Sequence, residues 1–335
     1  MRLILSFIVL LPIVLALSCS STESGSKNKK ELKLSKSDQR KLDEARLELQ
    51  LGRNMAGRLL QYYGHYDNEE LIKYVNEVGL YVSANSNNPD RRYMFDIINT
   101  EEINAFACPG GYILISKGAL RHAENEAELA HVLAHEIAHV AKKHMYDTLR
   151  SMTPEQMDEA SGSAKKKYGF DEDKAVRQRP DPEQNEFGAA IAKYITGGNI
   201  GFNVLGAAKA GMSLILENGL GAEKEYEADK LGTKYAVEAG YDPHALQNYL
   251  CRLEQTRGKS FRKCMRGKKL NSKKHKTLSE EEKIPMDKTH PEVDMRIKVI
   301  QKTLRKLEAK DIVGAKGTKR YRKYKRQIPS QKVRM

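Results

Sequence analysis

Two histidines four residues apart constrain this chain more than any other feature. The sequence HEIAH at 135–139 continues an apolar run without glycine or proline, which predicts a buried helix from 125 to about 146. Side chains four positions apart on a helix project from nearly the same face, about 40° apart. His135 and His139 can therefore bind one metal ion, and the carboxylate of Glu136 can reach a water on that ion.

A chance match is the alternative, because a motif with three fixed positions recurs by accident on amphipathic helices. Hydrolytic zinc sites take three protein ligands and keep a fourth position for water, so a third ligand has to come from elsewhere. His144 is not the expected one. It lies nine residues after His135, which turns it about 180° away on a continuous helix, and no glycine between His139 and His144 breaks that helix.

The third ligand is expected on an acidic helix over 222–237. Glu225 and Asp229 share one face, so one carboxylate can bind the metal while the other accepts the second N–H of a metal-bound histidine. Glu223 and Glu227 have the same spacing and share a nearly opposite face. Spacing alone does not choose between the two pairs, and a solvated acidic helix face is the alternative for both.

The remaining patterns predict an α+β fold. Alternating apolar residues predict a small sheet with strands at 93–98, 103–107 and 112–115, the last two joined by a Gly-Gly turn. Further helices are expected at 37–63, 68–84, 117–122, 243–256 and 291–308. We therefore expect one mostly helical domain over 37–310, with the sheet beside the metal-binding helix and a charged insertion or lid at 151–215.

The first 18 residues are typical of an export signal, with Arg2 ahead of an almost wholly apolar stretch. About 15 apolar residues span roughly 22 Å as a helix, short of the roughly 30 Å hydrocarbon core of a bilayer. Cys19 follows small residues and opens a Ser- and Lys-rich tether over 19–36. This order predicts a periplasmic protein anchored by lipid on Cys19 to the cell envelope, at the outer membrane rather than the inner. Cleavage after Ser18 without lipidation is the alternative.

Three cysteines remain beyond the signal. Cys251 and Cys264 close a short loop and are the expected disulfide pair in an oxidising compartment, with two free thiols as the alternative. For Cys108 we expect a packing role rather than contact with the metal or a redox response.

The positive charge of the chain is concentrated near its C-terminal end. Of the net charge of +14, residues 301–335 contribute +11, from 13 Lys and Arg against Glu308 and Asp311. Behind an export signal we expect no nucleic-acid partner. A basic tail over 311–335 is instead expected to bind anionic lipid headgroups or an envelope assembly partner, and a merely solvated, disordered tail is the alternative.

Several short sequence motifs of this chain occur together in one protein family. In chain order they are YVN at 74–76, NAF at 104–106, PGG at 109–111, NEAEL at 125–129, EYEAD at 225–229 and HP at 290–291, followed by Arg296. Together with HEIAH, this order makes residues 71–296 resemble the HtpX and CAAX-prenyl-protease family of zinc endopeptidases, in its soluble periplasmic branch. The resemblance implies a zincin-like domain that binds one Zn²⁺ per chain.

The resemblance also implies roles for particular residues. Glu225 is the third zinc ligand, with Asp229 holding a metal-bound histidine. Glu136 is the general base. His290 is either a second electrophile in catalysis or a cover for the metal in a resting state, and Arg296 is an orienting or transition-state residue. The strand that contains Asn104, Ala105 and Phe106 is the edge to which a substrate backbone adds as an extra strand.

These features predict a zinc-dependent endopeptidase that hydrolyses misfolded or stalled envelope proteins. An outer-membrane assembly chaperone or scaffold, in which proteolysis is secondary, is the main alternative. A pure scaffold has no need of Glu136. An exopeptidase or another zinc hydrolase is less favoured, because the sequence has no obvious motif that binds a chain terminus.

Overall fold

Three short strands form a mixed sheet in the order β1-β3-β2. Strand β1 (Met94–Ile98) runs parallel to β3 (Tyr112–Ser116), and β2 (Ala105–Cys108) pairs with β3 in antiparallel register. The turn between β2 and β3 is the short 3₁₀ segment η1 (Pro109–Gly111), in which Gly111 has a φ of 97° and a Cβ would lie 2.0 Å from the carbonyl oxygen of Arg92. Glycine is required there, and the hairpin matches the sequence prediction.

The computed structural model describes residues 35–168, 204–256, 261–266, 292–309 and 311–329. Several expectations lie outside the described residues: the export signal, Cys19 and most of the tether, positions 169–203 of the insertion, His290, and the last six residues of the basic segment.

Helices make up most of the described chain, which confirms the α+β class. They are α1 (Lys36–Tyr63), α2 (Glu69–Ser83), α3 (Lys117–His122), α4 (Glu126–Ala141), α5 (His144–Ser151), α6 (Pro154–Tyr168), α8 (Val204–Ser213) with the π-helical turn η3 (Leu214–Asn218), α9 (Ala222–Glu238), α10 (Ala245–Thr256), α11 (Phe261–Met265), α13 (Val293–Lys306) and α14 (Thr318–Lys325). Within the described ranges, no helix has both the length and the apolar character needed to cross a membrane.

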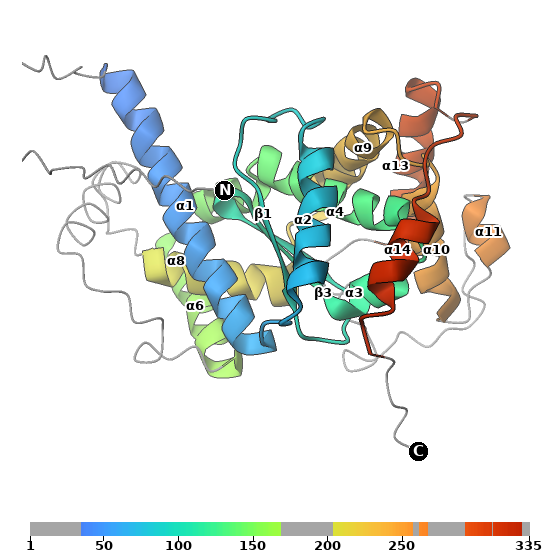
Figure 1. Cartoon of the computed structure of the whole chain (residues 1–335). Helices are drawn as coiled ribbons and strands as arrows, with labels where there is room; N and C mark the ends of the chain where they lie inside the picture. Colours follow the sequence, from blue (N-terminus) through green and yellow to red (C-terminus); the bar gives the residue numbers. More distant parts are fainter. Residues whose placement is uncertain (1–34, 169–203, 257–260, 267–291, 310, 330–335) are drawn as a thin grey trace, which may run out of the picture.

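Each face of the sheet packs against its own set of helices, because successive strand residues point to opposite faces. Ile113 and Ile115 belong to one hydrophobic core, with residues of α2, α4, α9, α10, α13 and α14. Leu114, Phe106 and Cys108 belong to a second core, with residues of α1, α5, α6 and α8. Figure 1 shows α1, α6 and α8 grouped on one side and α9, α10, α13 and α14 on the other. Since Cys108 is a buried member of the second core, it has the packing position expected of it.

The helix that carries the two histidines ends earlier than predicted. Helix α4 stops at Ala141, Lys143 adopts a left-handed conformation with a φ of 55°, and α5 starts at His144. The left-handed conformation costs a non-glycine residue roughly 1–2 kcal/mol. The Lys143 ammonium lies 3.3 Å from the Glu48 carboxylate, which favours the turn. The expected continuous helix to residue 146 is therefore wrong.

The described part of the basic segment, residues 311–329, is folded onto the domain, so the alternative of a merely solvated, disordered tail is wrong for these residues. Tyr321 is 2% exposed and donates a hydrogen bond to the carbonyl of Leu120. The ring of Tyr324 stacks on that of Tyr74 with centroids 4.0 Å apart. The tyrosines thus attach one side of α14 to the domain, while Lys319, Arg322 and Lys323 stay exposed on the other.

Cys251 of α10 and Cys264 of α11 are joined by a disulfide, so that α11 is fastened to the helical layer beside the sheet. The side chain of Gln247 donates to the carbonyl of Met265 at 2.7 Å, which supports the same attachment.

Candidate metal centre

Helices α4 and α9 pack closely enough to bring their polar faces together. A Cβ at Gly232 of α9 would lie 2.7 Å from the backbone nitrogen of His135 and 2.8 Å from its Cα. Only glycine allows so close an approach of two helix backbones. The contact turns the face of α9 that carries Glu225 and Asp229 toward the two histidines. The spacing of the carboxylates in the sequence did not determine which face of the helix this would be.

Three donor atoms converge between these helices. Nε2 of His135 and Nε2 of His139 lie 3.1 Å apart, and the Glu225 carboxylate oxygens lie 3.4 Å and 3.3 Å from them, respectively. Four ligands placed tetrahedrally at zinc bond lengths of about 2.0–2.2 Å are separated by about 3.3–3.6 Å. The donor set and its spacing therefore fit a zinc ion. Among the described residues, these three are the group of His, Cys, Asp and Glu that could hold a metal.

The site also stabilises positive charge. Burial opposes charge on the His135 imidazole, but hydrogen bonds to Asp229 and Glu225 raise its pKa to about 9. Burial alone would raise the pKa of Asp229, yet the adjacent Arg296 and His135 lower it to about 2. A pocket in which the Asp229 carboxylate stays ionised suits a divalent cation.

Asp229 lies behind the three converging side chains and contacts the second nitrogen of His135. Its Oδ1 is 3.0 Å from Nδ1 of His135. Arg296 of α13 is 3% exposed and donates two hydrogen bonds to Asp229, and its Nη2 lies 3.5 Å from Nδ1 of His135. The guanidinium is thus held behind the three side chains that could bind a metal.

Glu136 lies where two hollows of the surface meet. Both hollows are lined by Glu136 together with Asn104 and Ala105. The first also includes His139, Glu225, Phe106, Ala107, Met145, Leu214, Ile215, Gly219 and Leu220. The second also includes His135, Arg296, Val132, Leu246, Tyr249 and Leu250. Strand β2 is an edge of the sheet formed by the described residues. Its first residues line both hollows, so this edge borders a largely apolar cleft on both sides of Glu136.

His144 lies close to the centre, contrary to the position expected on a continuous helix. Its Nδ1 is 3.0 Å from Nδ1 of His139, and its Nε2 is 3.0 Å from the Glu227 carboxylate. It contacts the side of His139 that faces away from the other ligands. Sequence reasoning missed this pair because it assumed an unbroken helix. The available signal was the pair of lysines after Ala141, since basic residues are favoured at helix ends.

Comparisons with known proteins agree with this geometry. The sequence model of Peptidase family M48 matches residues 69–304. The Beta-barrel assembly-enhancing protease of Yersinia pestis is 29% identical over 192 residues, which cover 55% of this chain and 32% of the relative. The Putative beta-barrel assembly-enhancing protease of Vibrio cholerae is 30% identical over 183 residues, which cover 55% and 33%.

A shorter match concerns a eukaryotic protein. The Mitochondrial metalloendopeptidase OMA1 of Arabidopsis thaliana is 37% identical over 49 residues, which cover 15% of this chain and 10% of the relative. The chain spans about a third of the length of the beta-barrel assembly-enhancing relatives that it matches.

Proposed function

Because the chain belongs to Peptidase family M48, we propose that it is a zinc-dependent endopeptidase whose metal is held by His135, His139 and Glu225. The observation that carries this proposal is the convergence of the three donor atoms beside Glu136. A bound zinc ion supplies a Lewis acid that makes water acidic near neutral pH and polarises a peptide carbonyl.

The protein's own groups then move the protons and position the substrate. Glu136 is 5% exposed and follows a metal ligand directly on α4. Its carboxylate takes a proton from the attacking water and delivers it to the nitrogen of the leaving amine. Asp229 accepts the Nδ1 proton of His135, which keeps Nε2 of that histidine available as a ligand. Arg296 holds Asp229 in place and is proposed as a positioning residue.

The cleft favours extended polypeptides as substrates. A strand edge binds a peptide through its backbone, so that recognition depends little on side-chain sequence. Asn104, Ala105 and Phe106 offer such an edge directly beside Glu136. We propose misfolded or stalled envelope proteins as the substrate class, in keeping with the names of the bacterial relatives. An assembly chaperone that uses the same cleft for binding is the second candidate.

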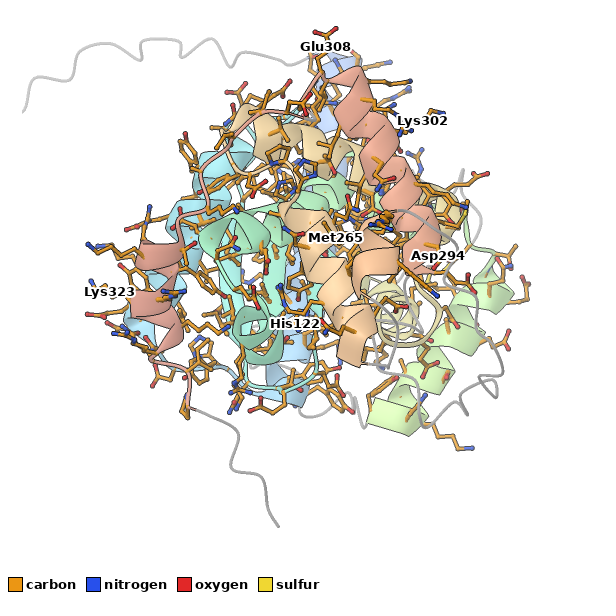
Figure 2. All side chains as sticks on the ribbon, turned by 90° about the vertical axis from the view of Figure 1, so that its right-hand side faces the viewer. His122, Met265, Asp294, Lys302, Glu308 and Lys323 are labelled. Carbon is orange, nitrogen blue, oxygen red and sulfur yellow. A yellow bond between two sulfur atoms is a disulfide. The ribbon has the colours of Figure 1, made fainter. Side chains whose placement is uncertain are left out.

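The proposed setting is the bacterial envelope. Lipid on Cys19 would anchor the protein in the periplasm, at the outer membrane. The outer side of α14 supports contact with an anionic membrane or an acidic assembly partner, because Lys319, Arg322, Lys323 and Arg326 are exposed there. Figure 2 shows Lys323 pointing away from the body of the domain. Bilayers that contain anionic lipid attract such clusters by about 1 kcal/mol per cation.

The proposal is tested by comparing the purified protein with Glu136→Gln. We expect both proteins to contain one zinc ion per chain, and only the first to cleave casein. The amide keeps the shape of the side chain and removes the base. Equal cleavage by both proteins would reject Glu136 as the base. Retained zinc and retained binding of unfolded polypeptide, with no cleavage by either protein, would favour the chaperone.

A further inference from the structure

The two histidines of the metal centre are supported differently at their outer nitrogens. A histidine that binds a metal normally donates its other N–H to a fixed acceptor, which sets its tautomer and its ring orientation. For His135 this acceptor is Asp229, which is fully buried and paired with Arg296. For His139 the neighbour at the same position is another imidazole, that of His144.

We propose that His144, supported by Glu227, is the positioning residue for His139. The inference rests on the proposed metal centre and extends it to a pair of residues outside the ligand set. His144 is 4% exposed, and its ring centroid lies 4.9 Å from that of His139 at an interplanar angle of 81°. This edge-on arrangement directs the Nδ1 atoms of the two rings at each other at 3.0 Å.

The hydrogen-bond directions follow from ligation. A neutral imidazole that binds a metal through Nε2 carries its proton on Nδ1. His139 therefore donates from Nδ1 to Nδ1 of His144, which accepts through its lone pair. The proton of His144 then lies on Nε2, which donates to the Glu227 carboxylate 3.0 Å away. The carboxylate favours the one tautomer of His144 that can accept from His139.

Local contacts hold this arrangement in place. The left-handed turn at Lys143 brings His144 back beside the helix that it follows. Thr148 donates a hydrogen bond to the carbonyl of His144 at 2.7 Å. Lys142 forms an exposed ion pair with Oε1 of Glu227 at 3.0 Å, not with the Oε2 that accepts from His144, so this pair is not needed for the arrangement. Because the side chain of Glu227 is 41% exposed, the support of His139 ends at the protein surface, unlike the buried support of His135.

The test is the zinc affinity of the full chain, measured by competition with a chelator, together with the visible spectrum of the Co²⁺-substituted protein. His144→Phe keeps a ring and removes the acceptor, and we expect zinc to bind about 10- to 100-fold more weakly. His144→Asn offers a carbonyl oxygen near the position of Nδ1 and should recover most of the loss. Lys142→Ala, which leaves the imidazole pair intact, is the control and should bind zinc like the unaltered protein.

Glu227→Ala is the second variant, to be used if His144→Phe does not fold. Its position is half-exposed, so the substitution leaves no cavity in the core. We expect it to weaken zinc binding by about 10-fold, the lower end of the range for such outer partners. The Co²⁺ spectrum should shift in His144→Phe and not in Lys142→Ala, a change that a loss of packing alone would not cause.

Several outcomes would overturn the inference. The first is an unchanged zinc affinity in His144→Phe, and the second is an equal loss of zinc affinity in His144→Phe and His144→Asn. If His144→Phe does not fold, an unchanged zinc affinity in Glu227→Ala is the third. An unaltered protein that binds no zinc would reject the metal centre itself. If the variants show the expected order of zinc affinities but the unaltered protein does not cleave casein, only the proposed peptidase function is contradicted.

Discussion

The guanidinium of Arg296 binds the carboxylate of Asp229 through two parallel hydrogen bonds, from Nη2 to Oδ1 at 2.7 Å and from Nε to Oδ2 at 2.9 Å. Asp229 is fully buried, and its Oδ1 also contacts Nδ1 of His135. One ion pair therefore connects α13, α9 and α4 directly behind the proposed metal ligands. The geometry of the centre depends on a helix that follows the two ligand helices in the chain.

Removing the arginine should destabilise the protein strongly. In Arg296→Met the buried Asp229 carboxylate loses its partner, and breaking a buried pair in this way typically costs about 3–5 kcal/mol. Denaturant unfolding of the metal-free protein measures the change. Arg296→Lys restores the charge but not the two-pronged geometry, so we expect only partial recovery. A loss below about 1 kcal/mol in Arg296→Met would show that the pair does not hold the helices together.

Gly232→Ala should weaken zinc binding without altering any ligand. The added Cβ would meet backbone atoms of His135 and Ala134, which cannot move aside as a flexible side chain could. Overpacking of this kind costs about 1–3 kcal/mol, and it would push Glu225 away from the histidines.

The matched control is Gly162→Ala in α6, where a Cβ would have no neighbour within 4 Å. Alanine is the better helix former by up to about 1 kcal/mol, so the control should be slightly stabilised. Zinc affinity and the free energy of unfolding are measured for both variants. Unchanged zinc affinity in Gly232→Ala would contradict the close helix contact.

The buried His131 and the half-buried His122 should make the protein less stable in mild acid. Burial lowers the pKa of His122 and of His131 to about 4, while unfolded histidine titrates near 6.5. Between these values the unfolded chain binds more protons than the folded one. The free energy of unfolding is therefore free of this penalty above about pH 6.5, and it declines as the pH falls toward 4.

The slope is up to about 1.4 kcal/mol per pH unit for each histidine. His122, which Figure 2 labels, donates a hydrogen bond from Nε2 to the carbonyl oxygen of Tyr249. In His122→Gln, a side-chain amide can keep that contact without titrating. We expect the slope between pH 4 and 6.5, measured by denaturant unfolding with the metal removed, to fall by up to about 1.4 kcal/mol per pH unit. An unchanged slope would contradict the assignment to this residue.

The disulfide should contribute measurably to stability. It closes a loop with a sequence separation of 13 residues, for which loop-closure entropy predicts about 3 kcal/mol. We expect Cys251→Ala with Cys264→Ala to lower the free energy of unfolding by that amount, and a thiol reductant to do the same to the unaltered protein. Cys108→Ala keeps this disulfide and serves as the control for loss of a thiol, so the reductant should still lower its free energy of unfolding by about 3 kcal/mol.

Sequence patterns predicted those features that depend on neighbours within one element. HEIAH places two imidazoles on one face of a helix, and Glu225 and Asp229 share a face of another, whatever else the chain does. The strand pattern of 112–115 likewise depends only on alternation. The choice of carboxylate pair had to come from family resemblance, because it depends on the packing of Gly232 against a distant helix backbone.

The features that sequence reasoning missed depend on contacts between distant segments. The left-handed turn at Lys143 is accompanied by an ion pair with Glu48, about a hundred residues earlier. The docking of α14 requires Tyr74 as a stacking partner for Tyr324. Neither partner is visible in the local pattern of lysines and arginines, which on its own is typical of a solvated segment.

The most direct test of the account is the zinc affinity of Glu225→Ala beside that of the unaltered protein. If three side chains from α4 and α9 hold one zinc ion, removing the only ligand from α9 should weaken binding by more than about 100-fold, beyond the range typical of outer partners. Equal zinc affinity in a folded Glu225→Ala protein would contradict the proposed metal centre.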